Sequence, residues 1–61
     1  MAQNWLVNFI DKDGKTMAIK QINCYQAYRA PAIAVAAMKK RDPEGTELIV
    51  RNTHSIKIED A

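Results

Sequence analysis

The chain has 61 residues, a single cysteine and a formal net charge of +2 at pH 7. A chain of this length makes one domain at most and buries only about 60% of its unfolded surface, so its core supplies roughly 3–5 kcal/mol. One cysteine excludes an intramolecular disulfide, and no Cys/His set has the spacing of a zinc site. We therefore expect one small domain over residues 1–61 that gains stability from self-association or from a partner.

No segment of the sequence is long and apolar enough to cross a membrane. The longest apolar run covers residues 30–38, far short of the roughly 20 residues that a bilayer requires. The first residues lack the basic start and the cleavable apolar run of a secretory signal. We expect a soluble, cytoplasmic protein without membrane contact, whose mildly basic charge permits contact with nucleic acid without demanding it.

A β-hairpin is predicted at the start of the chain. Residues 5–10 and 17–22 are rich in β-branched and aromatic side chains, and Asp-Lys-Asp-Gly lies between them. Two turns fit this spacing. One is a two-residue loop at Asp13-Gly14, and the other is a type I turn at Lys12-Asp13 followed by Gly14 in a left-handed bulge.

The choice of turn decides which side chains share a face of the sheet. The bulged turn places Val7 opposite Ile19 and Phe9 opposite Met17, whereas the two-residue loop places Val7 opposite Lys20. A slip of one residue moves every side chain to the other face. We favour the bulge because it gathers the apolar side chains on one face.

An alanine-rich helix is predicted from about residue 31 to residue 41. Pro31 suits the first position of a helix, whereas in mid-helix it would cost about 3 kcal/mol. Asn23 is expected to cap a short helical turn over residues 24–28 that precedes it, and Asp42-Pro43-Glu44-Gly45 is expected to end the helix. A stripe of mostly small side chains would let the helix lie close to a sheet. The stripe consists of Ala30, Ile33, Ala34, Ala37 and Met38.

Two further strands are predicted after the helix, over residues 46–51 and 55–59, where apolar and polar side chains alternate. A turn at residues 52–54 would align Val50 with Ile56 and Leu48 with Ile58. The predicted fold is therefore α+β, a single ββαββ domain with one helix packed on one face of an antiparallel sheet. A right-handed crossover gives the strand order 2-1-3-4, with the second and fourth strands as free edges.

Two motifs resemble phosphate or calcium loops but are incomplete. Gly14-Lys15-Thr16 copies the end of a phosphate-binding loop, but Phe9 stands where that loop needs another glycine. Asp11-Lys12-Asp13-Gly14 resembles the start of a calcium loop, but Ile22 stands where a bidentate glutamate is required. We expect neither ligand.

Cys24 and His54 are the one conceivable pair of nucleophile and base. A lone cysteine is usually a small buried apolar residue, and a lone histidine in a polar turn is usually solvated. We therefore expect no enzymatic activity, no catalytic residues, no metal site and no cofactor.

The predicted sheet leaves aliphatic side chains on the face turned away from the helix. Contiguous apolar surface commonly marks a contact with another protein. We therefore predict a non-enzymatic protein-binding module, which could also form a homodimer through a sheet edge or through this outer face. The predicted contact residues are Leu6, Asn8, Ile10, Lys20, Ile22, Ile49 and Arg51.

A small nucleic-acid-binding protein is the second hypothesis, and a homodimeric assembly subunit is the third. Lys39, Lys40 and Arg41 form the only basic run, to which Lys57 would add from the outer face of the sheet. Cations at a helix C-terminus also offset the negative end of the helix dipole. No aromatic side chain interleaves with the run, so we rank this hypothesis below protein binding.

The layout of the chain resembles that of small phage host-takeover proteins, among them the T7-type inhibitors of bacterial RNA polymerase. The likeness runs from the aromatic first strand with Trp5-Leu6-Val7 through the alanine-rich helix to the turn Pro43-Glu44-Gly45 and the predicted strand that ends in Arg51. This chain lacks a marked acidic stretch and adds a predicted fourth strand. The resemblance implies a compact protein in the host cytoplasm that binds and inhibits or redirects a host enzyme without chemistry of its own.

Overall fold

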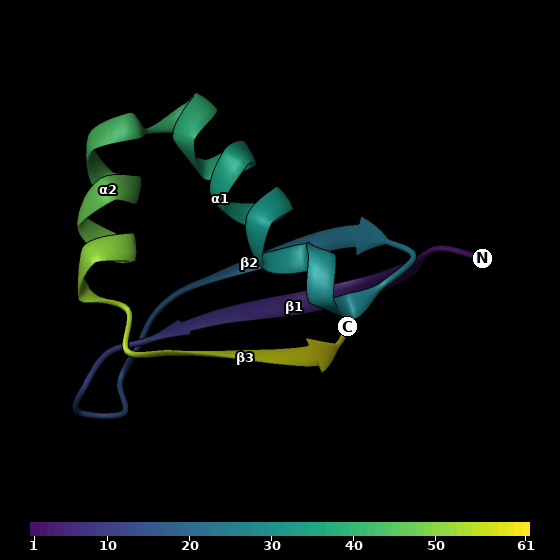
Figure 1. Ribbon diagram of the computed structural model, residues 1–61, viewed down its shortest axis with the longest axis horizontal. Coiled ribbons are helices and arrows are strands. Elements are labelled where there is room, and N and C mark those ends of the chain that lie inside the picture. Colours follow the sequence, from purple (N-terminus) through teal and green to yellow (C-terminus); the bar gives the residue numbers. More distant parts are fainter.

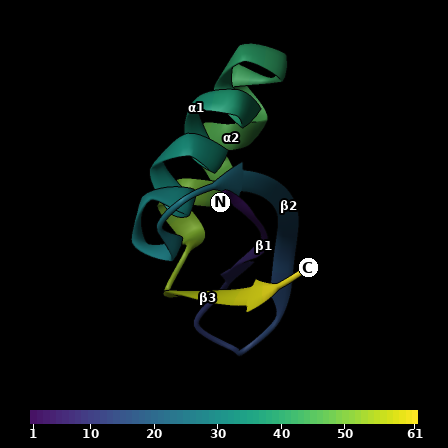
Figure 2. The same ribbon diagram turned by 90° about the vertical axis from the view of Figure 1, so that its right-hand side faces the viewer.

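The computed structural model describes residues 1–61 and contains a three-stranded antiparallel sheet and two α-helices. The strand order is β2-β1-β3, and both helices lie over the same face of the curved sheet (Figures 1 and 2). Neither helix could span a membrane. The elements are β1 (Gln3–Ile10), β2 (Thr16–Cys24), a 3-10 turn (Ala27–Arg29), α1 (Ala30–Arg41), α2 (Pro43–Asn52) and β3 (Ser55–Asp60). The predicted α+β class is confirmed, but the predicted four strands and single helix are not.

The prediction of a strand over residues 46–51 is wrong, because this segment belongs to α2. Asp42 caps the helix: its Oδ1 accepts a hydrogen bond of 3.0 Å from the backbone N–H of Gly45. Pro43 and Glu44 occupy the first turn, where proline lacks only an N–H that would stay unpaired and an acidic side chain favours the helix dipole. Asp42 therefore ends α1 and starts α2.

The loss of that strand changes the sheet. β3 takes the place beside β1 that the segment 46–51 was expected to occupy, and the sheet ends there. The predicted pairs of Val50 with Ile56 and of Leu48 with Ile58 do not form. Residues 55–59 were expected to form an edge strand, and this prediction is confirmed.

The hairpin turn is the predicted one. The Gly14 N–H donates to the Asp11 carbonyl at 3.1 Å, and the Asp11 N–H donates to the Lys15 carbonyl at 2.9 Å. Gly14 has a φ of 83°, a left-handed conformation that suits glycine. Oδ1 of Asp11 also accepts from the N–H groups of Asp13 and Lys15, which fixes the loop.

The predicted register is nevertheless wrong, because a second bulge follows the turn. Ile10 pairs with Thr16 and Phe9 with Ala18, which leaves Met17 as an extra residue in β2. Val7 consequently pairs with Lys20 and not with Ile19. Beyond the bulge, the slip turns the odd-numbered side chains of β2 to the outer face and the even-numbered ones to the helix side.

The core lies between β1, β2 and α1. As predicted, Val7 and Phe9 face the helix, and they pack with Ala30, Ala34 and Ile22. α1 ends at Arg41 as expected, with Pro31 in its first turn.

Two details of the predicted helical region differ. Of the expected stripe only Ala30 and Ala34 are fully buried, whereas Ala37 and Met38 are half-buried and Ile33 is exposed. Asn23 does not cap a turn: it lies in β2, and its Nδ2 donates to Oδ1 of Asn4 at 3.0 Å.

The Asp42 cap gives the first prediction. Because D42A removes the acceptor for the Gly45 N–H, we expect a loss of about 0.5–2 kcal/mol. In a domain of this size each kcal/mol lowers Tm by about 4–8 °C, which circular dichroism measures. The control D42N keeps an acceptor oxygen and should melt close to wild type. If D42A had the same Tm as wild type, the cap would not contribute to stability.

The close approach of α1 to the sheet gives a second prediction. Ala34 is completely buried, whereas Ala36 on the same helix is exposed. The larger side chain of A34L would push α1 off the sheet and should cost about 1–3 kcal/mol. The matched variant A36L should stay within about 0.5 kcal/mol of wild type. Equal melting curves for the two variants would contradict the observed packing.

Candidate functional site

The structure divides the predicted contact residues between two sides of the molecule. Leu6, Asn8 and Ile10 lie on the outer face of β1, as predicted, because they alternate with the buried Val7 and Phe9. A residue that was not predicted there joins them on this face. Ile19, which pairs with Asn8, is 58% exposed.

The other four predicted contact residues lie elsewhere. Ile22 is only 6% exposed and belongs to the core, and Lys20 lies on the helix side of β2. Ile49 belongs to α2 and packs against the core. Arg51, also on α2, forms an exposed ion pair of 2.9 Å with Glu47. The predicted patch is therefore not one surface, because the bulge and the second helix redistribute its members.

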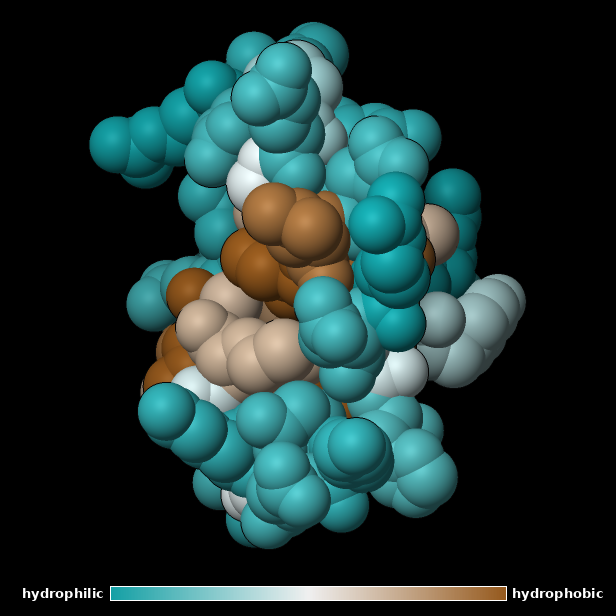
Figure 3. All heavy atoms as spheres, turned by 90° about the vertical axis from the view of Figure 1, so that its left-hand side faces the viewer, coloured by the Kyte–Doolittle hydropathy of each residue, from teal (hydrophilic) through white to brown (hydrophobic).

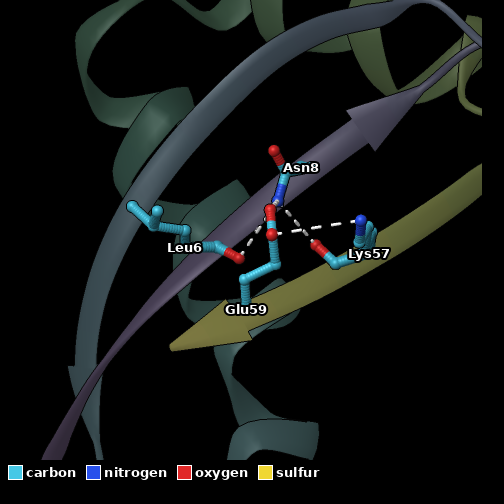
Figure 4. Close-up of polar contacts among 4 residues, drawn as sticks. All are labelled: Leu6, Asn8, Lys57 and Glu59. Atoms are coloured by element: carbon cyan, nitrogen blue, oxygen red, sulfur yellow. Dashed lines mark hydrogen bonds and ion pairs between the residues drawn. The ribbon is translucent and has the colours of Figure 1, made fainter. Parts of the chain in front are cut away.

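The side chain of Asn8 is hydrogen-bonded within the sheet. It is 6% exposed although it lies on the outer face. Its Nδ2 donates to the Leu6 carbonyl at 3.4 Å, the Lys57 carbonyl at 3.1 Å and Oε1 of Glu59 at 3.0 Å (Figure 4). Nζ of Lys57 lies 3.9 Å from Oε2 of the same glutamate. The amide therefore ties β1 to β3 and has no free donor to offer a partner.

The predicted basic cluster does not assemble in full. Lys39, Lys40 and Arg41 occupy the exposed last turn of α1. Lys57 lies on the opposite side of the sheet beside Glu59, so it cannot join them. Lys20 does come close, because it lines a hollow of about 350 Å³ together with Arg41 and Asp42. The acidic start of α2 places negative charge at the same corner, which disfavours a phosphate backbone.

The two candidates for catalysis lie at opposite ends of the sheet. Cys24 pairs with Gln3 at one end, and its Sγ donates to the Gln26 carbonyl at 3.2 Å. At the other end, the backbone N–H of His54 donates a hydrogen bond to the Ile10 carbonyl. A hollow of about 500 Å³ near His54 is lined mainly by polar residues of mixed charge, and no group of three or more His, Cys, Asp or Glu could hold a metal ion.

Comparison with protein-family models, curated proteins and solved structures finds no match. The geometry of the chain itself is therefore what indicates a site.

One edge of the sheet is unprotected. The edge of β2 carries the Met17 bulge and a lysine turned to the helix side, two features that discourage pairing with another strand. β3 contains no proline and pairs with β1 without a register shift. β3 therefore lacks the two features that discourage pairing along β2.

The free hydrogen-bonding groups of β3 can be assigned. The Ala61 N–H donates to the Asn4 carbonyl at 3.0 Å. Because bonded and non-bonded pairs alternate in an antiparallel ladder, Lys57 and Glu59 bond to β1. The N–H and C=O groups of Ile56, Ile58 and Asp60 point away from the sheet. These groups form the unpaired backbone of the edge.

An apolar groove adjoins this edge. It has a volume of about 150 Å³ and lies where β1, β3, α1 and α2 meet. Ile56 and Val50 border it and are 43% and 46% exposed. Its lining consists of Phe9, Val35, Val50, Thr53 and Ile56. The sequence predicted the edge strand but not the groove, because the groove exists only where α2 replaces the expected third strand.

The apolar surface around α2 extends beyond the groove. Seen from the side that carries α2 and the hairpin loop, apolar side chains gather in the middle of the surface with hydrophilic ones above and below (Figure 3). Leu48 and Val50 are the exposed large apolar side chains of α2. Exposed apolar side chains therefore gather around the second helix, and Ile19 adds apolar surface on the outer face of the sheet.

The polar network of Asn8 gives a third prediction. N8D replaces the donating amide with a carboxylate that faces three acceptor oxygens, so it should cost about 1–3 kcal/mol or more. N8A removes the donor without adding repulsion and should cost only about 0.5–1.5 kcal/mol. Urea unfolding followed by tryptophan fluorescence would measure both. If N8D were no worse than N8A, the amide would not be the donor in this network.

Proposed function

We propose that the protein is a non-enzymatic protein-binding module that takes an extended segment of its partner as an additional strand along β3. The observation that carries this proposal is the unpaired backbone of β3 beside an apolar groove. In strand addition, main-chain hydrogen bonds supply affinity, and pockets for alternate side chains supply specificity. The β3 edge supports the proposal with an unpaired backbone and one apolar groove for a partner side chain.

The side chains along β3 define the chemistry of a suitable partner. Ile56 and Ile58 face the helix side, and Lys57 and Glu59 face the outer side. A partner strand would place an apolar side chain over the groove beside Ile56. On the other face it would gain from an acidic residue opposite Lys57 and a basic residue opposite Glu59. The partner is therefore an extended segment that alternates aliphatic and charged residues.

The sequence resemblance supports a class of target. Small phage host-takeover proteins bind host enzymes, and the likeness rests on the first strand and the alanine-rich helix. The segment that ends in Arg51 no longer supports it, because this segment belongs to α2 and is not a strand. We therefore propose a bacterial enzyme, such as RNA polymerase, as the partner that this module inhibits or redirects.

A proline substitution at the edge tests this mode of binding. I56P removes the outward N–H of Ile56, and I56A shortens the side chain in the same way but keeps the N–H. Both variants should fold, because a proline is tolerated on an edge strand where the N–H faces solvent. In pulldowns from nuclease-treated bacterial lysate, we expect I56A to retain the same proteins as wild type but less well, because Ile56 borders the groove. I56P should retain them at least about tenfold less well than I56A.

The same pulldown can contradict the proposal. Equal retention by I56P and I56A would show that the β3 edge is not the contact. If retention depended on nucleic acid, or vanished in the variant K39A/K40A/R41A, the basic run would be the site and protein binding through β3 would be wrong. Thermal melts of all variants confirm that a lost interaction is not a lost fold.

A further inference from the structure

We infer that β3 of a second copy pairs with β3 in antiparallel orientation, centred on Ile58, so that the chain forms a homodimer in which each copy covers the open edge of the other. The inference rests on the proposed function in that both use this edge. The second copy is the occupant of the edge when no other partner strand is bound.

The charges along β3 are self-complementary in this register. Lys57 faces Glu59 of the second copy, and Glu59 faces Lys57 of the second copy. A pair centred on Lys57 would bring the two lysines face to face, and one centred on Glu59 would do the same with the glutamates. Like charges directly opposite one another destabilise a strand pair, whereas opposite charges stabilise it. The Ile58-centred register is therefore the one in which charge favours association.

The backbone geometry fits the same register. The N–H and C=O groups of Ile58 point away from the sheet, so the two copies of this residue can exchange hydrogen bonds across a two-fold axis. Ile56 then bonds with Asp60 of the second copy. Lys57 and Glu59 fall at the non-bonded positions between these pairs, where facing side chains lie closer together. Their side chains are 66% and 47% exposed and so can make the contact.

Dimerisation would also compensate for the small size of the core. Only seven of the 61 residues are buried, and chains this short commonly need an additional source of stability. Pairing through β3 would join two three-stranded sheets into one continuous sheet. Because the β2 edge carries a bulge and Lys20, further copies are not expected to add there. Association should therefore stop at two chains.

Charge exchange tests the register. Sedimentation equilibrium should show concentration-dependent dimers for the wild type. K57E and E59K each replace both attractive contacts with repulsive ones, so each variant alone should dimerise at least about tenfold more weakly. An equimolar mixture of K57E and E59K restores opposite charges at both contacts and should form a heterodimer. The double variant K57E/E59K should dimerise about as well as wild type.

Amide exchange provides a second measurement. Lys57 and Glu59 bond to β1, so their N–H groups should be protected at every concentration. The N–H groups of Ile56 and Ile58 should exchange rapidly in dilute protein and become protected as the dimer forms. Protection that did not change with concentration would contradict the proposed pairing.

The remaining outcomes are also decisive. A wild type that stays monomeric, or single variants that associate as well as wild type, would overturn the inference. The mixture controls for folding, since two variants that are separately monomeric can associate only if both are folded.

The results separate this inference from the proposed function. If the wild type is monomeric but I56P still loses its lysate partners, self-pairing is wrong and the proposed function stands. If the charge variants behave as expected but I56P retains those partners unchanged, the proposed function is wrong and self-pairing stands.

Discussion

The contact of two alanines with the middle strand determines the rest of the structure. Ala30 and Ala34 are completely buried against the face that holds Val7 and Phe9. Because their side chains are single methyl groups, α1 lies close to β1 and β2, and a helix so placed cannot also cover β3. Asp42 then turns the chain into α2, which diverges from α1 (Figure 1). The uncovered edge and the groove beside it follow from this arrangement.

The region after α1 shows where the sequence pattern was ambiguous. Thr46, Ile49, Val50 and Thr53 repeat at helical spacing, yet the same segment also alternates in the manner of a strand. In so short a segment the apolar pattern cannot separate the two periods. The deciding signal is at the start, where an aspartate, a proline and a glutamate form a typical helix N-terminus. These residues both stop α1 and start α2.

The local turn could be predicted, but the register of the sheet could not. Asp11 and Gly14 specify the loop through local hydrogen bonds, so the sequence was sufficient there. The bulge at Met17 shifts the register of β2, and no residue type in this segment predicts it. For this reason Leu6, Asn8 and Ile10 were placed correctly on the outer face, whereas Lys20 and Ile22 were not. The groove depends on four elements meeting and so lay beyond prediction from sequence.

The unequal edges of the sheet connect assembly with binding. An edge that carries a bulge and an inward lysine resists pairing, so a chain with one such edge and one open edge can close into a pair but cannot grow into a fibre. If the open edge is shared between a second copy and a partner strand, the partner binds only the fraction of chains whose edge is free. Its apparent dissociation constant rises in inverse proportion to that fraction. Self-pairing of β3 would therefore disfavour partner strands that bind the edge weakly. Only strands whose affinity for the edge exceeds that of a second copy would bind.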